Sequence, residues 1–223
     1  MSNFKPNLPQ DNAKIVVMST NNKELVNRVE ELGIKVLSSE NLGKLLIFEQ
    51  YHTDLQFLHY NKDTVFVLNE CTSLKENLKK YFPNVIEISK NIEKDYPNNV
   101  MLNCVVLNDK LICNSKTIAD EVLQMAIKDN LKIINVNQGY TKCSTCIVRE
   151  NAIITSDKSI YNSCRNEMDV LLIRQGYIEL PGVDYGFIGG SSFKVNKNTL
   201  AFLKKKFKKF FKSVYQPVSS RFL

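Results

Sequence analysis

The feature of this sequence that most limits its possible folds is an internal repeat. The stretch "CVVLNDKLICNSKTI" at 104–118 resembles "CIVRENAIITSDKSI" at 146–160, which begins 42 residues later. Both contain a cysteine, two β-branched residues, a turn, an apolar run and a polar segment that ends in Lys-x-Ile. The hairpin part recurs from Phe193 as "FKVNKNTLAF". Self-similarity at a fixed period is typical of a fold that is built from like units.

Each copy predicts a hairpin that is followed by a helix and a third strand. In one copy we expect strands at 103–107 and 110–113, a helix at 116–128 and a buried strand at "LKIINV". The order strand, helix, strand favours parallel pairing through right-handed crossovers. Similar segments elsewhere bring the number of units to five, at about 13–38, 52–88, 103–136, 145–173 and 193–202. They predict one α/β domain over 13–202 that closes into a ring, with an atypical last unit.

Local signals indicate where some of these elements begin and end. The segment "NKELVNRVEELG" predicts a helix that ends at Gly33, because glycine readily adopts the left-handed conformation found after helices. The segment "SLKENLKKYF" predicts a helix that begins at the capping residue Ser73. Between them, "DLQFLHY" at 54–60 is typical of a strand.

Composition excludes several classes of protein. The chain is 43% hydrophobic and 24% charged, as is usual for a globular domain, and it has no apolar run near the length of a membrane span. The start, "MSNFKPNLPQDNAK", lacks the apolar core of a secretory signal, so we expect a cytoplasmic protein. The six cysteines are then expected to stay reduced.

The net charge of +7 comes entirely from one end of the chain. Residues 204–223 carry seven Lys or Arg and no Asp or Glu, which leaves the remainder neutral. Apolar residues at helical spacing predict that 203–223 includes a basic amphipathic helix: Leu203, Phe207, Phe210, Phe211 and Val214. It could be the fifth unit's helix, a segment Lys204–Lys212 that contacts an acidic partner (ribosome, nucleic acid or anionic membrane), or a tail altered by a frameshift.

Three motifs resemble a little-characterised bacterial family with the pentein fold: "QGYTKCST", "AIITSDKSI" and "LPGVDYGFIGGSS". The segment "HTDLQ" at 52–56 matches that family's His-x-Asp segment. The resemblance covers about 13–202 and implies a five-bladed, pseudo-symmetric α/β propeller of ββαβ units. Penteins include enzymes that modify guanidino groups, and also a ribosome-binding translation factor without catalysis.

The sequence departs from the pentein pattern at two places. Phe193 follows "GGSS", where the family usually has a glycine, and the segment after Phe202 lacks the family's second His-Pro-Asp-like motif. Characterised pentein enzymes carry their nucleophilic cysteine in the last unit, but no cysteine follows Cys164 here. Their mechanism therefore cannot be transferred directly.

The pair Cys143 and Cys146 is the first candidate for chemistry. Two histidines and a single Cys-x-x-Cys are too few for a zinc site, and a pair at the start of a strand lacks the helix N-terminus of a redox motif. Cys146 aligns with Cys104 and is expected to pack. Cys143 has no counterpart in the repeat, and the neighbouring charge of Lys142 would lower the pKa of its thiol. Cys143 is therefore either a nucleophile or an idle buried thiol.

His52 and Asp54 are the second candidate. On a strand they would face the same side, so that an imidazole for proton transfer and a carboxylate for a guanidinium could meet one ligand. The alternative is an exposed histidine beside a turn aspartate.

The remaining candidates would bind substrate. Asp157 could do so or simply cap a helix, and Gly189 and Gly190 could let backbone approach a ligand or form a bend between units. Gln138 and Lys142 are added because they lie in the "QGYTKCST" motif. No metal and no cofactor are expected.

Two functions remain open from the sequence. In the first, an enzyme binds a small guanidino or amidino molecule in the central channel and attacks it with Cys143, assisted by His52 and Asp54. In the second, the protein is a binding module without catalysis whose basic tail contacts an acidic partner. The oligomeric state is not predicted.

Overall fold

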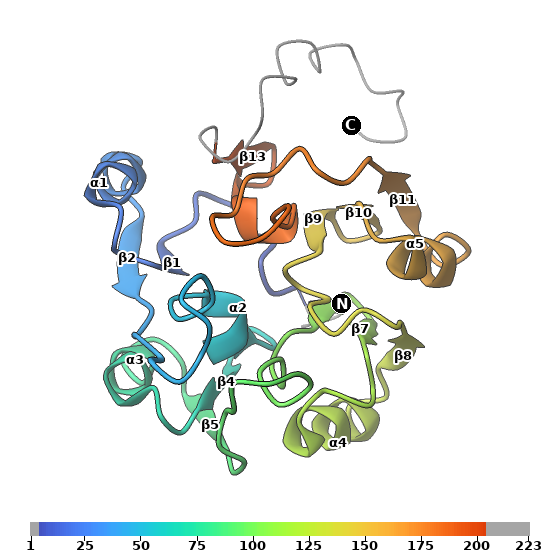
Figure 1. Cartoon of the computed structure of the whole chain (residues 1–223), viewed down its shortest axis with the longest axis horizontal. Coiled ribbons are helices and arrows are strands. Elements are labelled where there is room, and N and C mark those ends of the chain that lie inside the picture. Colours follow the sequence, from blue (N-terminus) through green and yellow to red (C-terminus); the bar gives the residue numbers. More distant parts are fainter. Residues whose placement is uncertain (1–4, 204–223) are drawn as a thin grey trace.

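The computed structural model describes residues 5–203. Five small sheets follow one another along this part of the chain, with two, three, three, three and two strands. In Figure 1 they are arranged about a common centre, with four helices toward the outside: α1 (Lys23–Glu31), α3 (Thr72–Leu78), α4 (Asp120–Lys128) and α5 (Lys158–Cys164).

The three three-stranded sheets share one topology. In each, the middle strand pairs antiparallel with the strand before it and parallel with the strand after its helix. Their strands are β3 (Phe57–His59), β4 (Thr64–Leu68) and β5 (Asn84–Ile88); β6 (Val105–Leu107), β7 (Lys110–Cys113) and β8 (Lys132–Asn135); β9 (Thr145–Arg149), β10 (Ala152–Thr155) and β11 (Asp169–Leu172). The strands β7 and β10 begin 42 residues apart, at 110 and 152, which is the spacing found in the sequence.

The first and last sheets have two strands each. β1 (Ile15–Met18) and β2 (Lys35–Ser38) are parallel and flank α1, whereas β12 (Ser192–Asn196) and β13 (Thr199–Phe202) form a hairpin after the short 3-10 helix η1 (Gly189–Ser191). Val195 of the hairpin packs with Val29 and Ile34 of the first unit in one apolar cluster. The two ends of the described chain therefore lie together.

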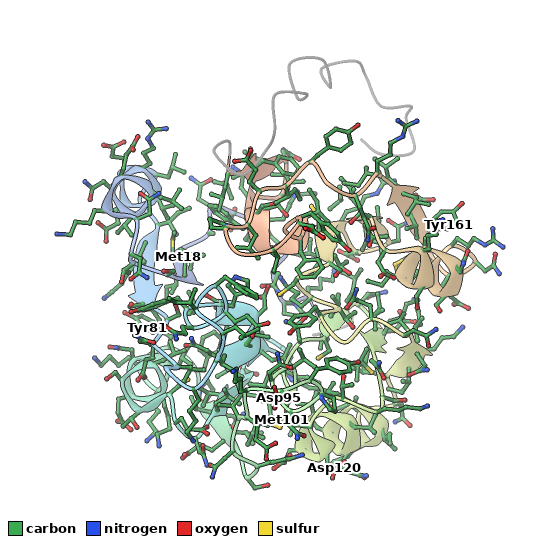
Figure 2. All side chains as sticks on the ribbon, in the orientation of Figure 1. Met18, Tyr81, Asp95, Met101, Asp120 and Tyr161 are labelled. Atoms are coloured by element: carbon green, nitrogen blue, oxygen red, sulfur yellow. The ribbon has the colours of Figure 1, made fainter. Side chains whose placement is uncertain are left out.

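Side chains fill the space between the ribbons of neighbouring units (Figure 2). The largest apolar cluster joins the second and third units through buried residues such as Leu58, Phe66 and Leu111. A second cluster joins the third and fourth units through Ile112 and Ile153. Burying these side chains in shared clusters stabilises the units against one another by the hydrophobic effect.

Most predicted elements are present, and the differences have local causes. α1 begins after Asn22, whose side chain accepts the amide hydrogen of Leu25, and Gly33 has the left-handed φ of 76° that was expected. Ser73 does not cap α3; the Glu40 carboxylate from another loop accepts the Leu74 amide instead, at 2.8 Å.

The segment that contains His52 and Asp54 is not the predicted strand. Its first residues form a single helical turn, α2 (Thr53–Gln56), because the carbonyl of His52 accepts the amide of Leu55. The buried Gln56 side chain holds this turn by donating to the carbonyls of Glu40 and Gln50. The expected strand begins only at Phe57.

The predicted basic helix lies outside the described residues, which end at Leu203. Within 5–203, no helix is long and apolar enough to cross a bilayer. The six cysteines all fall in this range, where each is buried and free.

Candidate active site

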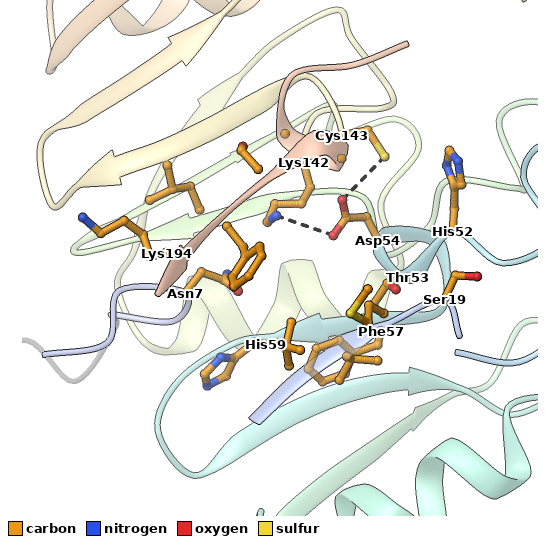
Figure 3. A pocket seen from close by; sticks show the side chains of 18 of the residues that line it. Asn7, Ser19, His52, Thr53, Asp54, Phe57, His59, Lys142, Cys143 and Lys194 are labelled. Carbon is orange, nitrogen blue, oxygen red and sulfur yellow. Dashed lines mark hydrogen bonds and ion pairs between the residues drawn. The ribbon is translucent and has the colours of Figure 1, made fainter. Parts of the chain in front are cut away.

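A cavity of about 690 Å³ contains most of the predicted site residues. Its walls come from the first, second and fourth units and from the last hairpin, which are distant in sequence (Figure 3). Six of the eight candidates line it: His52, Asp54, Lys142, Cys143, Gly189 and Gly190.

Cys143 lies in the loop between β8 and β9, with 2% of its surface exposed. Its sulfur accepts a hydrogen bond from Asn103 Nδ2 at 3.1 Å. The thiol donates toward Asp54 Oδ2, with 3.7 Å between sulfur and oxygen. The loop and α2 thus bring together a thiol and a carboxylate that are 89 residues apart in the chain.

The electrostatic surroundings of Cys143 differ from the prediction. Burial, followed by the negative charge of Asp54, raises the pKa of the thiol well above its usual value. The hydrogen bond from Asn103 and the charge of Lys142 act in the opposite direction but are weaker. Lys142 therefore lowers the pKa of the thiol, as expected, but burial and Asp54 outweigh it. The Lys142 ammonium also pairs with Asp54 Oδ1 at 3.5 Å.

Asn103 holds this arrangement together with one side chain. Its Oδ1 accepts the backbone amides of Lys142 at 2.8 Å and of Cys143 at 3.1 Å. Its Nδ2 donates to the carbonyl of Asp54 at 3.2 Å as well as to the thiol. Asn103 is 3% exposed, so these bonds are shielded from water.

Gly189 and Gly190 support the same loop from the other side. Their amides donate to the carbonyl of Cys143 at 2.7 and 3.1 Å. A Cβ atom on Gly189 would lie 2.5 Å from the Thr145 carbonyl oxygen and closer still to that of Lys142. The absence of a side chain at Gly189 thus lets it approach protein backbone rather than a ligand. A Cβ atom on the exposed Gly190 would meet nothing within 4 Å.

His52 precedes α2, and its amide donates to the carbonyl of Glu49 at 2.9 Å. Its ring and the Cys143 thiol belong to the wall of one cavity, although they come from different units (Figure 3). Since an imidazole exchanges protons near neutral pH, the cavity combines a thiol, a carboxylate and a proton donor. This set of groups can carry out nucleophilic attack with proton transfer to a leaving group.

Comparison with known proteins identifies the family. The model of a family of unknown function (DUF6873) matches residues 16–212. The chain belongs to this family. No curated protein matches the DUF6873 chain.

The fold of this DUF6873 protein resembles that of an amidinotransferase. The solved structure is SxtG, an amidinotransferase from Microseira wollei in the saxitoxin biosynthetic pathway, with a TM-score of 0.55 over 93% of this chain and 89% of that one. The two sequences are 11% identical, so the likeness extends to the fold alone. It supports the pentein-like fold that the sequence motifs implied.

Asp157 and Gln138, the other two candidates, are not among the residues that line this cavity of the DUF6873 protein. Asp157 caps α5 by accepting the amide of Ile160 at 2.9 Å. Its second carboxylate oxygen accepts from Gln138 Nε2 at 3.0 Å. The two side chains satisfy each other, so helix capping accounts for Asp157.

A buried network near the cavity was not predicted. Tyr140 donates to Glu49 Oε1 at 2.6 Å, and Asn99 Nδ2 donates to the same phenol oxygen at 2.6 Å. Burial and then Glu49 raise the pKa of Tyr140. The Tyr140 ring also stacks on Phe187, which lines the cavity. The sequence feature that could have drawn attention to Tyr140 is the tripeptide Gln-Gly-Tyr, which occurs at 138–140 and again at 175–177.

Among residues 5–203, no group of three or more His, Cys, Asp or Glu side chains is placed to hold a metal ion.

Replacing Asp54 with asparagine is expected to lower the pKa of the Cys143 thiol, because the variant removes the charge that raises it. Since the thiolate is the form that is alkylated, the pH of half-maximal iodoacetamide labelling should fall by about one pH unit or more. Labelling of Cys143 is followed by peptide mass mapping. Lys142→Met is the matched control and should shift the curve upward; identical curves for Asp54→Asn and wild type would contradict the assigned cause.

Proposed function

We propose that the protein acts on the guanidino or amidino carbon of a small molecule, with Cys143 as the nucleophile. The observation that carries this proposal is the contact between Cys143 and Asp54, 3.7 Å apart, on the wall of a cavity that His52 also lines. A thiol attacks carbon, a carboxylate holds the substrate cation, and an imidazole moves the proton.

The proposed architecture is a single domain over 13–202 whose five units close into a five-bladed propeller. Support comes from the apolar cluster shared by the first unit and the last hairpin, and from the amide of Ala13, which donates to the carbonyl of Val195 at 2.7 Å. In such a ring the cavity is the central channel. Residues from four units can then meet one small ligand.

Substrate binding would start at Asp54. A carboxylate can grip a guanidinium through two parallel N–H···O bonds, which are stronger than neutral hydrogen bonds. In the free protein, Lys142 Nζ lies 3.5 Å from Asp54 Oδ1. The substrate cation would therefore displace the Lys142 ammonium from this oxygen. Only a cation that outcompetes Lys142 is bound.

Binding of the cation also activates the thiol. The negative charge of Asp54 is one of the causes that raise the pKa of Cys143 in the free protein. A guanidinium on Asp54 offsets this charge and places a positive charge near the sulfur, so the thiolate becomes more favourable. Cys143 is therefore a weak nucleophile until substrate arrives, and Asn103 remains a donor to the developing thiolate.

The reaction then proceeds in two steps. The Cys143 thiol gives its proton to His52, and the resulting thiolate forms a carbon–sulfur bond with the guanidino carbon. One carbon–nitrogen bond then breaks as its amine leaves with that proton from His52. The product of this step is a thiouronium adduct on Cys143. Water or an amine attacks the adduct, gives a proton to His52 and breaks the carbon–sulfur bond, which regenerates the thiolate. Water makes the enzyme a hydrolase and an amine makes it a transferase.

A binding module without turnover is the second candidate. It is favoured by the raised pKa of the Cys143 thiol, since a protonated buried thiol is inert in the free protein. In this case the cavity still binds a small molecule, and Lys204–Lys212 would contact an acidic partner with an affinity that falls steeply with salt.

The test is to incubate the protein with a panel of guanidino and amidino compounds. Release of ammonia, urea or an amine is measured, together with the intact mass of the protein after acid quenching. The enzyme proposal predicts product release and a mass increase that maps to Cys143. Saturable binding without product or adduct across the panel would establish the binding module instead.

A further inference from the structure

The first unit has only two of the three strands found in the complete units. In those units the middle strands β4, β7 and β10 are each followed by a helix and a parallel partner, and each has an antiparallel partner on its other edge. β1 is likewise followed by α1 and its parallel partner β2. On its other edge, toward the centre of Figure 1, no strand pairs with it among residues 5–203.

The hydrogen bonds of β1 show which backbone groups face that edge. The carbonyls of Lys14 and Met18 accept amides from the β2 side, at 2.8 and 3.0 Å. In a strand, alternate residues point their N–H and C=O groups to opposite sides, so those of Ile15 and Val17 face away from β2. Ala13 has the same orientation, and its amide donates to Val195. For Ile15 and Val17, no partner on this side exists among the described residues.

The cavity runs along this free edge. All four residues of β1 line it, together with Phe57 of β3 and Phe193 of β12. Since side chains alternate between the two faces of a strand, a cavity that touches all four residues lies beside the strand rather than over one face. Strand edges of this kind are templates for pairing with another chain.

The charge of the cavity indicates what kind of chain fits. Of its lining lysines, Lys5 pairs with Glu150 and Lys142 with Asp54. Lys14 and Lys194 have no carboxylate partner among residues 5–203, and they outnumber the one lining carboxylate that has no ion pair there, Glu179. Lys194 donates to the carbonyl of Lys197. Burial lowers the pKa of Lys194, as expected for a partly buried cation that no acid compensates. In Figure 3, Lys194 lies at the left of the residues drawn, and Cys143 lies away from it, toward His52.

We propose that β1 is a docking site for an extended, acidic peptide segment of a partner protein, which pairs antiparallel with β1 and places a carboxylate near Lys14 and Lys194. The antiparallel direction follows from β3, β6 and β9, which occupy this position in the complete units. Backbone bonds to Ile15 and Val17 supply affinity, and the two lysines supply the preference for acid.

The docked segment would share the cavity with Cys143, so it would shield the thiol from reagents. This inference does not depend on the proposed reaction, because pairing with a strand edge requires no catalysis. A small guanidino ligand and the peptide should compete for the same space. The site would then be open to small molecules only when the partner is absent.

The experiment uses calorimetry on the full chain with a six-residue peptide of alternating Glu and Val, blocked at both ends. Saturable binding is expected, and bound peptide should slow iodoacetamide labelling of Cys143. A peptide with N-methylated valines keeps the charge but loses backbone donors, so its affinity should fall at least about tenfold. No saturable binding of the unmodified peptide up to about 1 mM would overturn the proposal.

Two variants separate the backbone and charge contributions. Val17→Pro removes an N–H that faces the cavity and leaves the bonds to β2 intact, so peptide affinity should fall at least about tenfold while thermal stability is retained. The double variant Lys14→Glu and Lys194→Glu should bind the Glu–Val peptide more weakly than wild type does. It should bind a peptide of alternating Lys and Val more tightly than wild type does. Equal affinities of this double variant for both peptides would overturn the role of charge, even if Val17→Pro fails to fold.

Discussion

Replacing Cys143 with serine is expected to reduce turnover of a guanidino substrate by about 10⁴-fold or more. A serine hydroxyl ionises far less readily than a thiol and is a much weaker nucleophile, whereas the thiol can reach its anionic form once Asp54 is neutralised. Loss of the nucleophile removes the covalent step rather than one contact, so little residual activity remains. The measurement is steady-state product release, with intact mass to detect the adduct.

Cys146→Ala is the matched control for this variant. Cys146 is three residues away and 1% exposed, and it packs with Ile178 and Ile188. Its loss should cost about 1 kcal/mol of stability and leave turnover within about threefold of wild type. If Cys143→Ser turned over substrate like wild type while Cys146→Ala did not, the nucleophile would be Cys146. If neither variant lost activity, the covalent mechanism would be wrong.

The order of helices and strands could be predicted because the signals for it are local. Turn residues, alternating apolar runs and the helix ends at Asn22 and Gly33 act within a few residues of chain. The turn of α2 could not be predicted in this way. It depends on Gln56, whose side chain reaches the carbonyls of Glu40 and Gln50, and this contact exists only after the loops have folded together.

Only part of the candidate site could be predicted, because some of its residues matter through contacts that form only in the folded chain. Cys143, Asp54 and His52 are residue types with their own chemistry, so they could be selected before their positions were known. Asn103 has no reactive group, and its importance comes entirely from bonds to residues 39 to 49 positions away. The effect of Lys142 was assigned the correct sign, but its size relative to burial depends on how deeply Cys143 lies.

Gly189→Ala is expected to destabilise the protein by about 3 kcal/mol or more. The added methyl group would lie 2.5 Å from the carbonyl oxygen of Thr145 and 2.7 Å from that of Cys143, and backbone atoms cannot move aside as a flexible side chain can. The loop must shift, which weakens the bonds from Gly189 and Gly190 to the Cys143 carbonyl. Urea unfolding gives the loss of stability, and faster alkylation of Cys143 reports the displaced thiol.

Gly190→Ala is the control that separates steric conflict from a general need for glycine in this loop. A Cβ at Gly190 meets no atom within 4 Å, and its φ is not in the left-handed region, so stability should stay within about 0.5 kcal/mol of wild type. Equal stability of Gly189→Ala and wild type would mean that the carbonyls of Lys142, Cys143 and Thr145 do not converge on residue 189. The loop would then not be held from this side, and the thiol position on which the proposed chemistry depends would rest on the bonds from Asn103 alone.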